Sequence, residues 1–149
     1  MLYAQIKTKQ SLFQKHDSIF DTNISGDYVL NTSPGVQLSE SGNVIFSAKC
    51  DYFYHLQTVK VKSNLLQNNK EFSLLGGNKL TIKQVKLFSE SWDIHYRNKL
   101  IGVYRCKVSL FPWVVKHEVT LTRDDKLYND LLLFSLLYMF EQDVNSTGI

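Results

Sequence analysis

The sequence predicts a mainly β fold: an antiparallel, closed β-barrel of about 9–12 strands that encloses one apolar C-terminal α-helix. Three observations predict it. Apolar and polar residues alternate along most of residues 1–123, as in strands with one buried face. The chain holds nine Phe, eight Tyr and two Trp, which suit half-buried pleated surfaces. The run Leu131–Phe140 is apolar on every side apart from one serine. We expect one domain over residues 1–149, with strands over about 2–123 and the helix over about 126–143.

The clearest strand of the first half is predicted over 44–52. Its inward-facing positions are expected to be Val44, Phe46, Ala48, Cys50 and Tyr52. Before it, the segment 36–39 and the turn-forming residues 40–43 predict a hairpin. Further strands are predicted over 57–62 and 71–75, with a turn over 64–70 between them.

The second half continues with a strand over 79–88, where the apolar positions change phase and predict a bulge near Gln84. A strand over 92–97 and a turn at 98–99 lead into a long strand over 100–111. The inward face of this strand is expected to carry Leu100, Gly102, Tyr104, Cys106, Val108 and Leu110. Pro112 ends it, because proline cannot donate to a ladder, and residues 115–121 alternate again.

Asp124 and Asp125 can cap the helix predicted over 126–143. A helix that is apolar all round requires protein on every side. It can lie inside the sheet, or cover a sheet face and a dimer interface together, and the β bias of the preceding residues favours the first. The run is shorter than the roughly 20 residues of a membrane span, and the first residues lack a signal-peptide pattern. We therefore expect a cytoplasmic protein, at most peripheral to the membrane.

The sequence contains no recognisable reaction machinery. The four histidines lie far apart and predict no metal site; they are His16, His55, His95 and His117. No catalytic residues and no cofactor are predicted, because no nucleophile elbow or phosphate-binding glycine loop is present. Cys50 and Cys106 are expected to be reduced core cysteines, on apolar faces where a thiolate is disfavoured. His117 is expected to be a hydrogen-bonded core histidine. An enzyme is therefore not predicted.

Basic residues on the polar strand faces are the remaining candidates for a binding site. The net charge of +3 predicts no nucleic-acid partner. A patch that holds an anionic ligand is predicted from Lys60, Lys62, Lys83, Arg97, Lys99, Arg105 and Lys107. Such a patch could bind phosphate or lipid headgroups. The alternative is an ordinary solvated strand face, on which lysines discourage edge-to-edge pairing.

The stretches 72–82 (FSLLGGNKLTI) and 86–103 (KLFSESWDIHYRNKLIGV), with the helix over 126–143, carry a family resemblance. The chain resembles the tubby C-terminal-like and LURP-one-related barrels, in particular their small bacterial members, which share a structural group with the phospholipid scramblases. The resemblance is strongest over 71–140. It implies twelve strands around a central helix, and eukaryotic members are linked to binding membrane phosphoinositides. A calcium-binding carboxylate cluster like that of the scramblases is not found.

The function that we expect is a non-enzymatic binding module, which contacts anionic lipid headgroups or a protein partner through its outer surface. Three alternatives remain open. A lipocalin-like carrier would hold a small molecule in the barrel with the helix outside. A homo-oligomeric structural protein would use the apolar helix in its interface. An enzyme would assemble its site from distant residues. The oligomeric state is not predicted.

Overall fold

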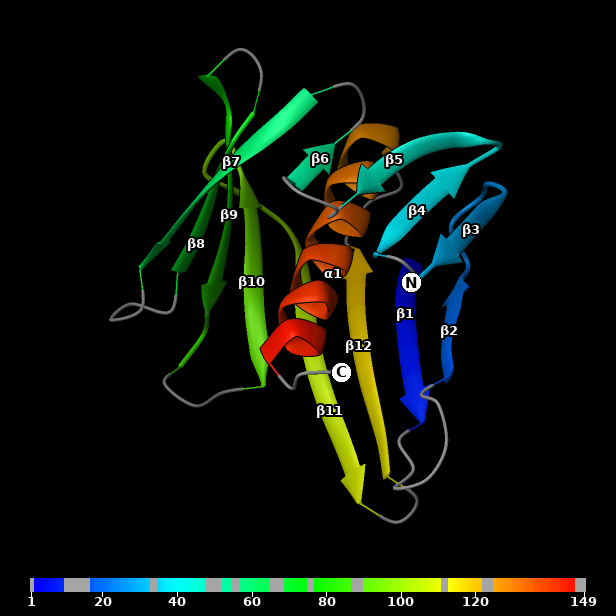
Figure 1. The fold of residues 1–149 in the computed structure, drawn as a ribbon. Coiled ribbons are helices and arrows are strands. Elements are labelled where there is room, and N and C mark those ends of the chain that lie inside the picture. The colour runs from blue at the N-terminus through cyan, green and yellow to red at the C-terminus, as the bar shows by residue number, and fades with distance from the viewer. Residues whose placement is uncertain are drawn as a thin grey trace.

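The computed structural model describes residues 2–9, 17–32, 35–47, 52–54, 57–64, 69–74, 77–86, 90–110, 113–121 and 125–146. These residues form twelve strands followed by one helix (Figure 1). The strands are β1 (Leu2–Lys9), β2 (Asp17–Thr22), β3 (Tyr28–Asn31), β4 (Gln37–Glu40), β5 (Asn43–Ser47), β6 (Tyr52–Tyr54), β7 (Gln57–Asn64), β8 (Asn69–Ser73), β9 (Lys79–Gln84), β10 (Ser91–Tyr96), β11 (Lys99–Leu110) and β12 (Trp113–Leu121). The helix is α1 (Lys126–Ser146). The predicted mainly β fold with a single C-terminal helix is confirmed for this part of the chain.

The strands form one sheet whose order is β2-β1-β12-β11-β10-β9-β8-β7-β6-β5-β4-β3. Every pairing is antiparallel, and from β3 to β12 each strand pairs with the next one along the chain. The first strand of the sequence, β1, pairs with the last, β12. The other edge of β1 pairs with β2. Among the described residues no ladder joins β2 to β3, so closure of the barrel stays a prediction.

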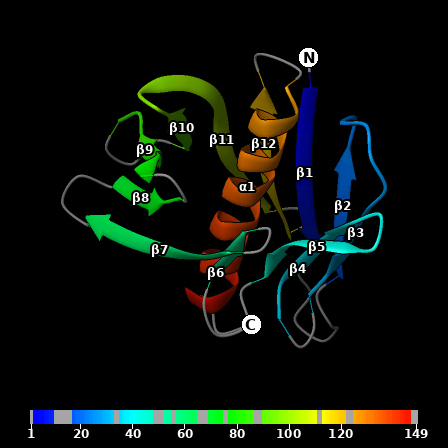
Figure 2. The same ribbon diagram turned by 90° about the horizontal axis from the view of Figure 1, so that it is seen from above.

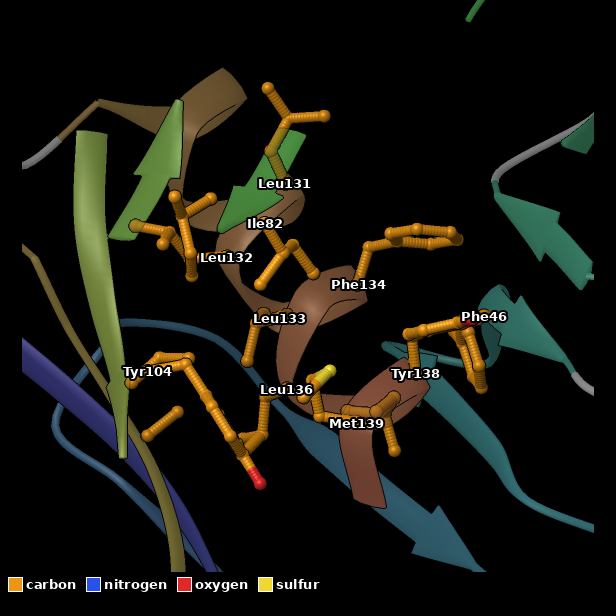
Figure 3. Packing of buried hydrophobic residues seen from close by; sticks show 14 of the residues in the cluster. Phe46, Ile82, Tyr104, Leu131, Leu132, Leu133, Phe134, Leu136, Tyr138 and Met139 are labelled. Carbon is orange, nitrogen blue, oxygen red and sulfur yellow. The ribbon is translucent and has the colours of Figure 1, made fainter. Parts of the chain in front are cut away.

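The sheet curls around α1, which runs through the middle of the molecule (Figure 2). Every residue from Leu131 to Phe140 is buried, because strands face the helix on its different sides. The side chains of the helix therefore point outward in all directions (Figure 3). The ring of Phe134 contacts Phe46 and Phe72 edge-on, with centroids 5.4 and 5.1 Å apart. Within the described residues, no helix has both the length and the apolar character needed to cross a bilayer.

Two local features position the helix. Asp125 caps its N-terminus, since Asp125 Oδ1 accepts hydrogen bonds from the backbone N–H groups of Leu127 and Tyr128, at 3.0 and 3.3 Å. Gly102 lets β11 approach the helix closely. A Cβ atom at Gly102 would lie 2.5 Å from Cδ2 of Leu132 and 2.6 Å from the backbone oxygen of Thr120. Only glycine leaves the space that Leu132 occupies.

The prediction of a single strand over 44–52 is wrong, because β5 ends at Ser47 and β6 begins at Tyr52. Residues 48–51 lie outside the described part of the chain, so the predicted inward faces of Ala48 and Cys50 are not tested. Where β4 pairs with β5, the register shifts between Leu38 and Ser39, so the bulged residue Ile45 has no register partner. The bulge therefore allows both Ile45 and Phe46 to be buried. The predicted hairpin at 40–43 is confirmed, with positive φ at Ser41 and Gly42.

The bulge predicted near Gln84 is also misplaced. Strand β9 ends at Gln84, and the register instead shifts between Ile94 and His95 where β10 pairs with β11. The shift turns Ile101 into the core and leaves Leu100 exposed. The predicted inward position of Leu100 is therefore wrong, because a bulge reverses the alternation on one side of it.

Candidate functional site

The β11–β12 hairpin extends past the C-terminal end of α1 (Figure 1). Inward-facing positions of the hairpin have no helix to cover them there. Their side chains are exposed by 57% at Val108, 67% at Leu110 and 46% at Trp113. Leu110 and Trp113 are direct cross-strand partners, and Val108 lies two positions further up the same face of β11. We call these three residues the tip surface.

A row of lysines crosses the outer face beside the tip surface. Lys107 of β11 is the register partner of Lys116 of β12, which in turn is the partner of Lys7 of β1. We call these three residues the lysine row; Lys7 and Lys107 are exposed and Lys116 is partly buried. Lys116 forms an ion pair with Glu118 at 3.2 Å, and exposed Lys9 lies two positions beyond Lys7. This end of the sheet therefore joins an exposed apolar hairpin to a cluster of cations.

The basic residues predicted to form one anion-binding site lie in separate places on the sheet. Arg105 and Lys107 lie on the outer face of β11, beside Glu118 and Lys116. Lys99 begins the same strand eight residues before Lys107, which places the two roughly 26 Å apart. The lysine row was missed because its member on β1 comes from a pairing of strands more than 100 residues apart in the sequence.

The other predicted residues lie on different strands. Lys83 of β9 is the register partner of Asp93. Arg97, in the β10–β11 turn, donates a hydrogen bond from Nε to Asn78 Oδ1 at 3.0 Å and lies over the ring of Tyr96. Lys60 and Lys62 lie on β7, where the structure describes the backbone but not these side chains.

An open pocket of about 320 Å³ lies beside the last turns of α1. It is lined by Trp92, Tyr104, Cys106, His117, Met139, Gln142 and Asp143. Cys106 and His117 are direct register partners on β11 and β12. His117 is only 1% exposed, and both of its ring nitrogens have partners. Nδ1 lies 2.6 Å from the Tyr104 hydroxyl and Nε2 lies 3.2 Å from Asp143 Oδ2, so the predicted hydrogen-bonded core histidine is confirmed.

The surroundings of His117 favour its charged form. Burial disfavours the imidazolium, but hydrogen bonds with Asp143 and Cys106 outweigh it and raise the pKa of His117 to about 9. Burial, followed by the neighbouring Cys106, raises the pKa of Tyr104 above its usual value. Cys106 is a free thiol, as predicted, but it is partly exposed and lines the pocket. Cys106 packs against the hydrophobic core, as expected for a core cysteine, but His117 and Tyr104 beside it add polar groups to its surroundings.

Within the described ranges, no three His, Cys, Asp or Glu side chains lie where they could hold a metal ion together. His16 and His55 lie outside those ranges. Comparisons with protein-family models, curated proteins and solved structures gave no match. The two features with distinctive chemistry in this part of the chain are therefore the tip surface with its lysine row and the pocket around Cys106.

Proposed function

We propose that this protein binds anionic membrane surfaces, and that the tip surface and the lysine row contact the bilayer. The observation that carries the proposal is the exposure of Val108, Leu110 and Trp113 at the end of a projecting hairpin. Large apolar side chains that protrude from a polar surface mark sites that partners or membranes cover. The two residues that join β11 to β12, Phe111 and Pro112, are apolar as well.

The composition of this region favours a membrane over a purely apolar partner. Tryptophan is enriched at membrane–water interfaces, where its ring lies at the level of the headgroups. Lysines next to an apolar insertion surface attract acidic lipids, and each contributes about 1 kcal/mol near a typical anionic leaflet. Lys7 and Lys107, the two exposed members of the lysine row, would therefore supply about 2 kcal/mol at low salt, and the apolar side chains would add to it. Such binding weakens as salt screens the charges.

The proposal includes a closed barrel of the tubby C-terminal-like kind, in which β2 and β3 complete the ring. Two observations support it: the described residues form twelve strands, the number that the resemblance implies, and an apolar helix lies inside their curve. Because α1 fills the interior, the lipocalin-like alternative has little to support it. Because the interior is filled, the proposed membrane contact lies on the exposed tip surface and the lysine row.

Co-sedimentation with vesicles tests the proposal. Vesicles of phosphatidylcholine with about one-third phosphatidylserine are expected to pellet the protein at low salt, and phosphatidylcholine alone is expected to pellet much less. Binding should fall steeply at about 1 M salt, where charges are screened beyond about 3 Å. If acidic vesicles fail to pellet the wild-type protein at low salt, the proposal is wrong.

Paired variants locate the contact. K107E/K116E is expected to reduce binding by about tenfold or more, and L110S/W113S is expected to reduce it at all salt concentrations. The matched control is K83E/K99E, which makes the same charge change on the same sheet away from the hairpin tip and should bind nearly as wild type. An equal loss in the control would contradict the assignment of the surface. A dimer in solution that W113S dissociates would instead identify a second copy as the occupant.

A further inference from the structure

We propose that Cys106 is a nucleophilic thiol, activated by Tyr104 and His117, and that its pocket accepts the acyl group of an ester or thioester with an apolar chain. This inference does not rest on membrane binding. It rests on four side chains that three elements bring to one open pocket: Tyr104 and Cys106 from β11, His117 from β12 and Asp143 from α1.

The arrangement has the parts that a thiol nucleophile needs. The nucleophile is accessible, since Cys106 is partly exposed and lines the pocket. A proton acceptor is next to it, because His117 is the direct cross-strand partner of Cys106 and lines the same pocket. An orienting carboxylate holds that acceptor, because Asp143 Oδ2 lies 3.2 Å from His117 Nε2. Nucleophile, base and orienting group are the three roles of such sites.

In this proposal Tyr104 links the Cys106 thiol to the His117 ring. Its hydroxyl lies 2.6 Å from His117 Nδ1, and Tyr104 lies two positions before Cys106 on the same face of β11. When the thiol proton has passed to His117, the imidazolium donates to the Tyr104 oxygen, and the Tyr104 O–H donates to the thiolate. The second imidazolium N–H donates to Asp143. Each charge that forms in the buried part of the site therefore has a partner, which lowers the free energy of the thiolate–imidazolium pair.

The substrate class follows from what surrounds the thiol. Val108 and Leu110 continue the face of β11 beyond Cys106 and are exposed, so an apolar chain attached to the reacting carbonyl has a surface to lie on. Trp92 and Gln142 line the pocket, and both side chains carry N–H donors of the kind that stabilise a developing oxyanion. Gln142 Nε2 donates one hydrogen bond to Glu141 Oε2 at 3.1 Å and has a second N–H. An acyl group with an apolar chain therefore matches both parts of the site.

Cys106 Sγ attacks the carbonyl carbon and forms a C–S bond, and the bond from that carbon to the leaving oxygen or sulfur breaks. The leaving group departs with the proton that His117 held. Neutral His117 can then deprotonate a water molecule that attacks the acyl-cysteine, which releases the carboxylic acid and returns the thiol.

A p-nitrophenyl octanoate assay tests the inference, with intact-protein mass spectrometry as a second readout. Wild type is expected to release p-nitrophenolate in a stoichiometric burst and to gain an octanoyl mass on Cys106. C50S is the matched control and should behave as wild type, whereas C106S should show no burst. If C106S keeps the burst, or if p-nitrophenyl acetate acylates Cys106 faster than the octanoate does, the assigned nucleophile or the assigned chain surface is wrong.

Alkylation with iodoacetamide separates an activated thiol from a merely accessible one. A free cysteine is only a few per cent thiolate at pH 7. Cys106 should therefore be alkylated about tenfold faster than a simple cysteine peptide at pH 7, after allowance for the lower nucleophilicity of a stabilised thiolate. D143N, a change at a positioning residue, should move the pH profile of this rate to higher pH. A rate no faster than that of the peptide would overturn the inference.

Discussion

Gly102→Ala tests the placement of α1 inside the sheet. The new Cβ would lie 2.5 Å from Leu132 Cδ2 and 2.6 Å from the backbone oxygen of Thr120, both closer than such atoms normally approach. Leu132 is fully buried and cannot move into solvent. Overpacking of this kind costs about 1–3 kcal/mol. The alanine recovers up to about 1 kcal/mol by restricting the unfolded chain. Because one of the two clashes is with backbone, we expect a net loss of about 2 kcal/mol in the free energy of unfolding.

The double variant Gly102→Ala/Leu132→Ala measures the contact itself. Leu132→Ala alone should cost about 3 kcal/mol, since it removes a buried leucine from a packed core. In the double variant the clash with Leu132 is gone, and only the clash with Thr120 remains. We therefore expect a coupling energy of about 1 kcal/mol, so that the double variant is more stable than independent effects would make it.

Urea unfolding followed by tryptophan fluorescence gives these free energies, provided that the m-value does not change. Gly42→Ala is the control: no atom lies within 4 Å of its Cβ position, but its φ is +85°. It should cost about 1 kcal/mol from backbone strain and add independently to Leu132→Ala. If Gly102→Ala and Leu132→Ala also add to within about 0.5 kcal/mol, Leu132 does not pack over Gly102 and the placement of the helix is wrong.

Three further predictions use the same measurement of the free energy of unfolding. Asp125→Ala should lower it by about 1 kcal/mol, because two backbone N–H groups lose their acceptor; no loss would show that the cap is not formed. Phe72→Ala should lower it by about 3–5 kcal/mol, because the ring is fully buried against Phe134 and Tyr138, and a value below about 1 kcal/mol would contradict that packing. The pKa of His117 is raised from 6.5 to about 9, so the stabilisation is fully present below pH 6.5 and lost as pH rises through 9; D143N should flatten this part of the pH profile, and an unchanged profile would contradict the pairing.

The local parts of the fold could be predicted because they depend on short stretches of sequence. The hairpin at Ser41 and Gly42 follows from turn chemistry, and the cap at Asp125 follows from the residue type before an apolar run. The bulges could not be placed in the same way. Whether Leu100 or Ile101 faces the core depends on where β11 loses register with β10, and both residues are equally apolar.

The pocket was only partly visible in the sequence. A hairpin centred on residues 111 and 112 sets Cys106 opposite His117, and this signal was available from the position of Pro112. Asp143 comes from the end of the helix, 26 residues after His117, and only the tertiary packing brings it there. The cations of the lysine row likewise depend on the pairing of β1 with β12, which local sequence patterns cannot predict.

The order of the elements along the chain has a consequence for synthesis. The twelve strands of the described residues all leave the ribosome before the helix that fills the space between them. Until residues 126–146 emerge, the apolar inner faces have no helix to cover them, and β1 must wait for β12 to arrive. Pairings between residues this far apart form slowly, and exposed strand faces favour aggregation in the meantime. We therefore expect a chaperone to help this protein most after the strands have been synthesised and before the helix has emerged.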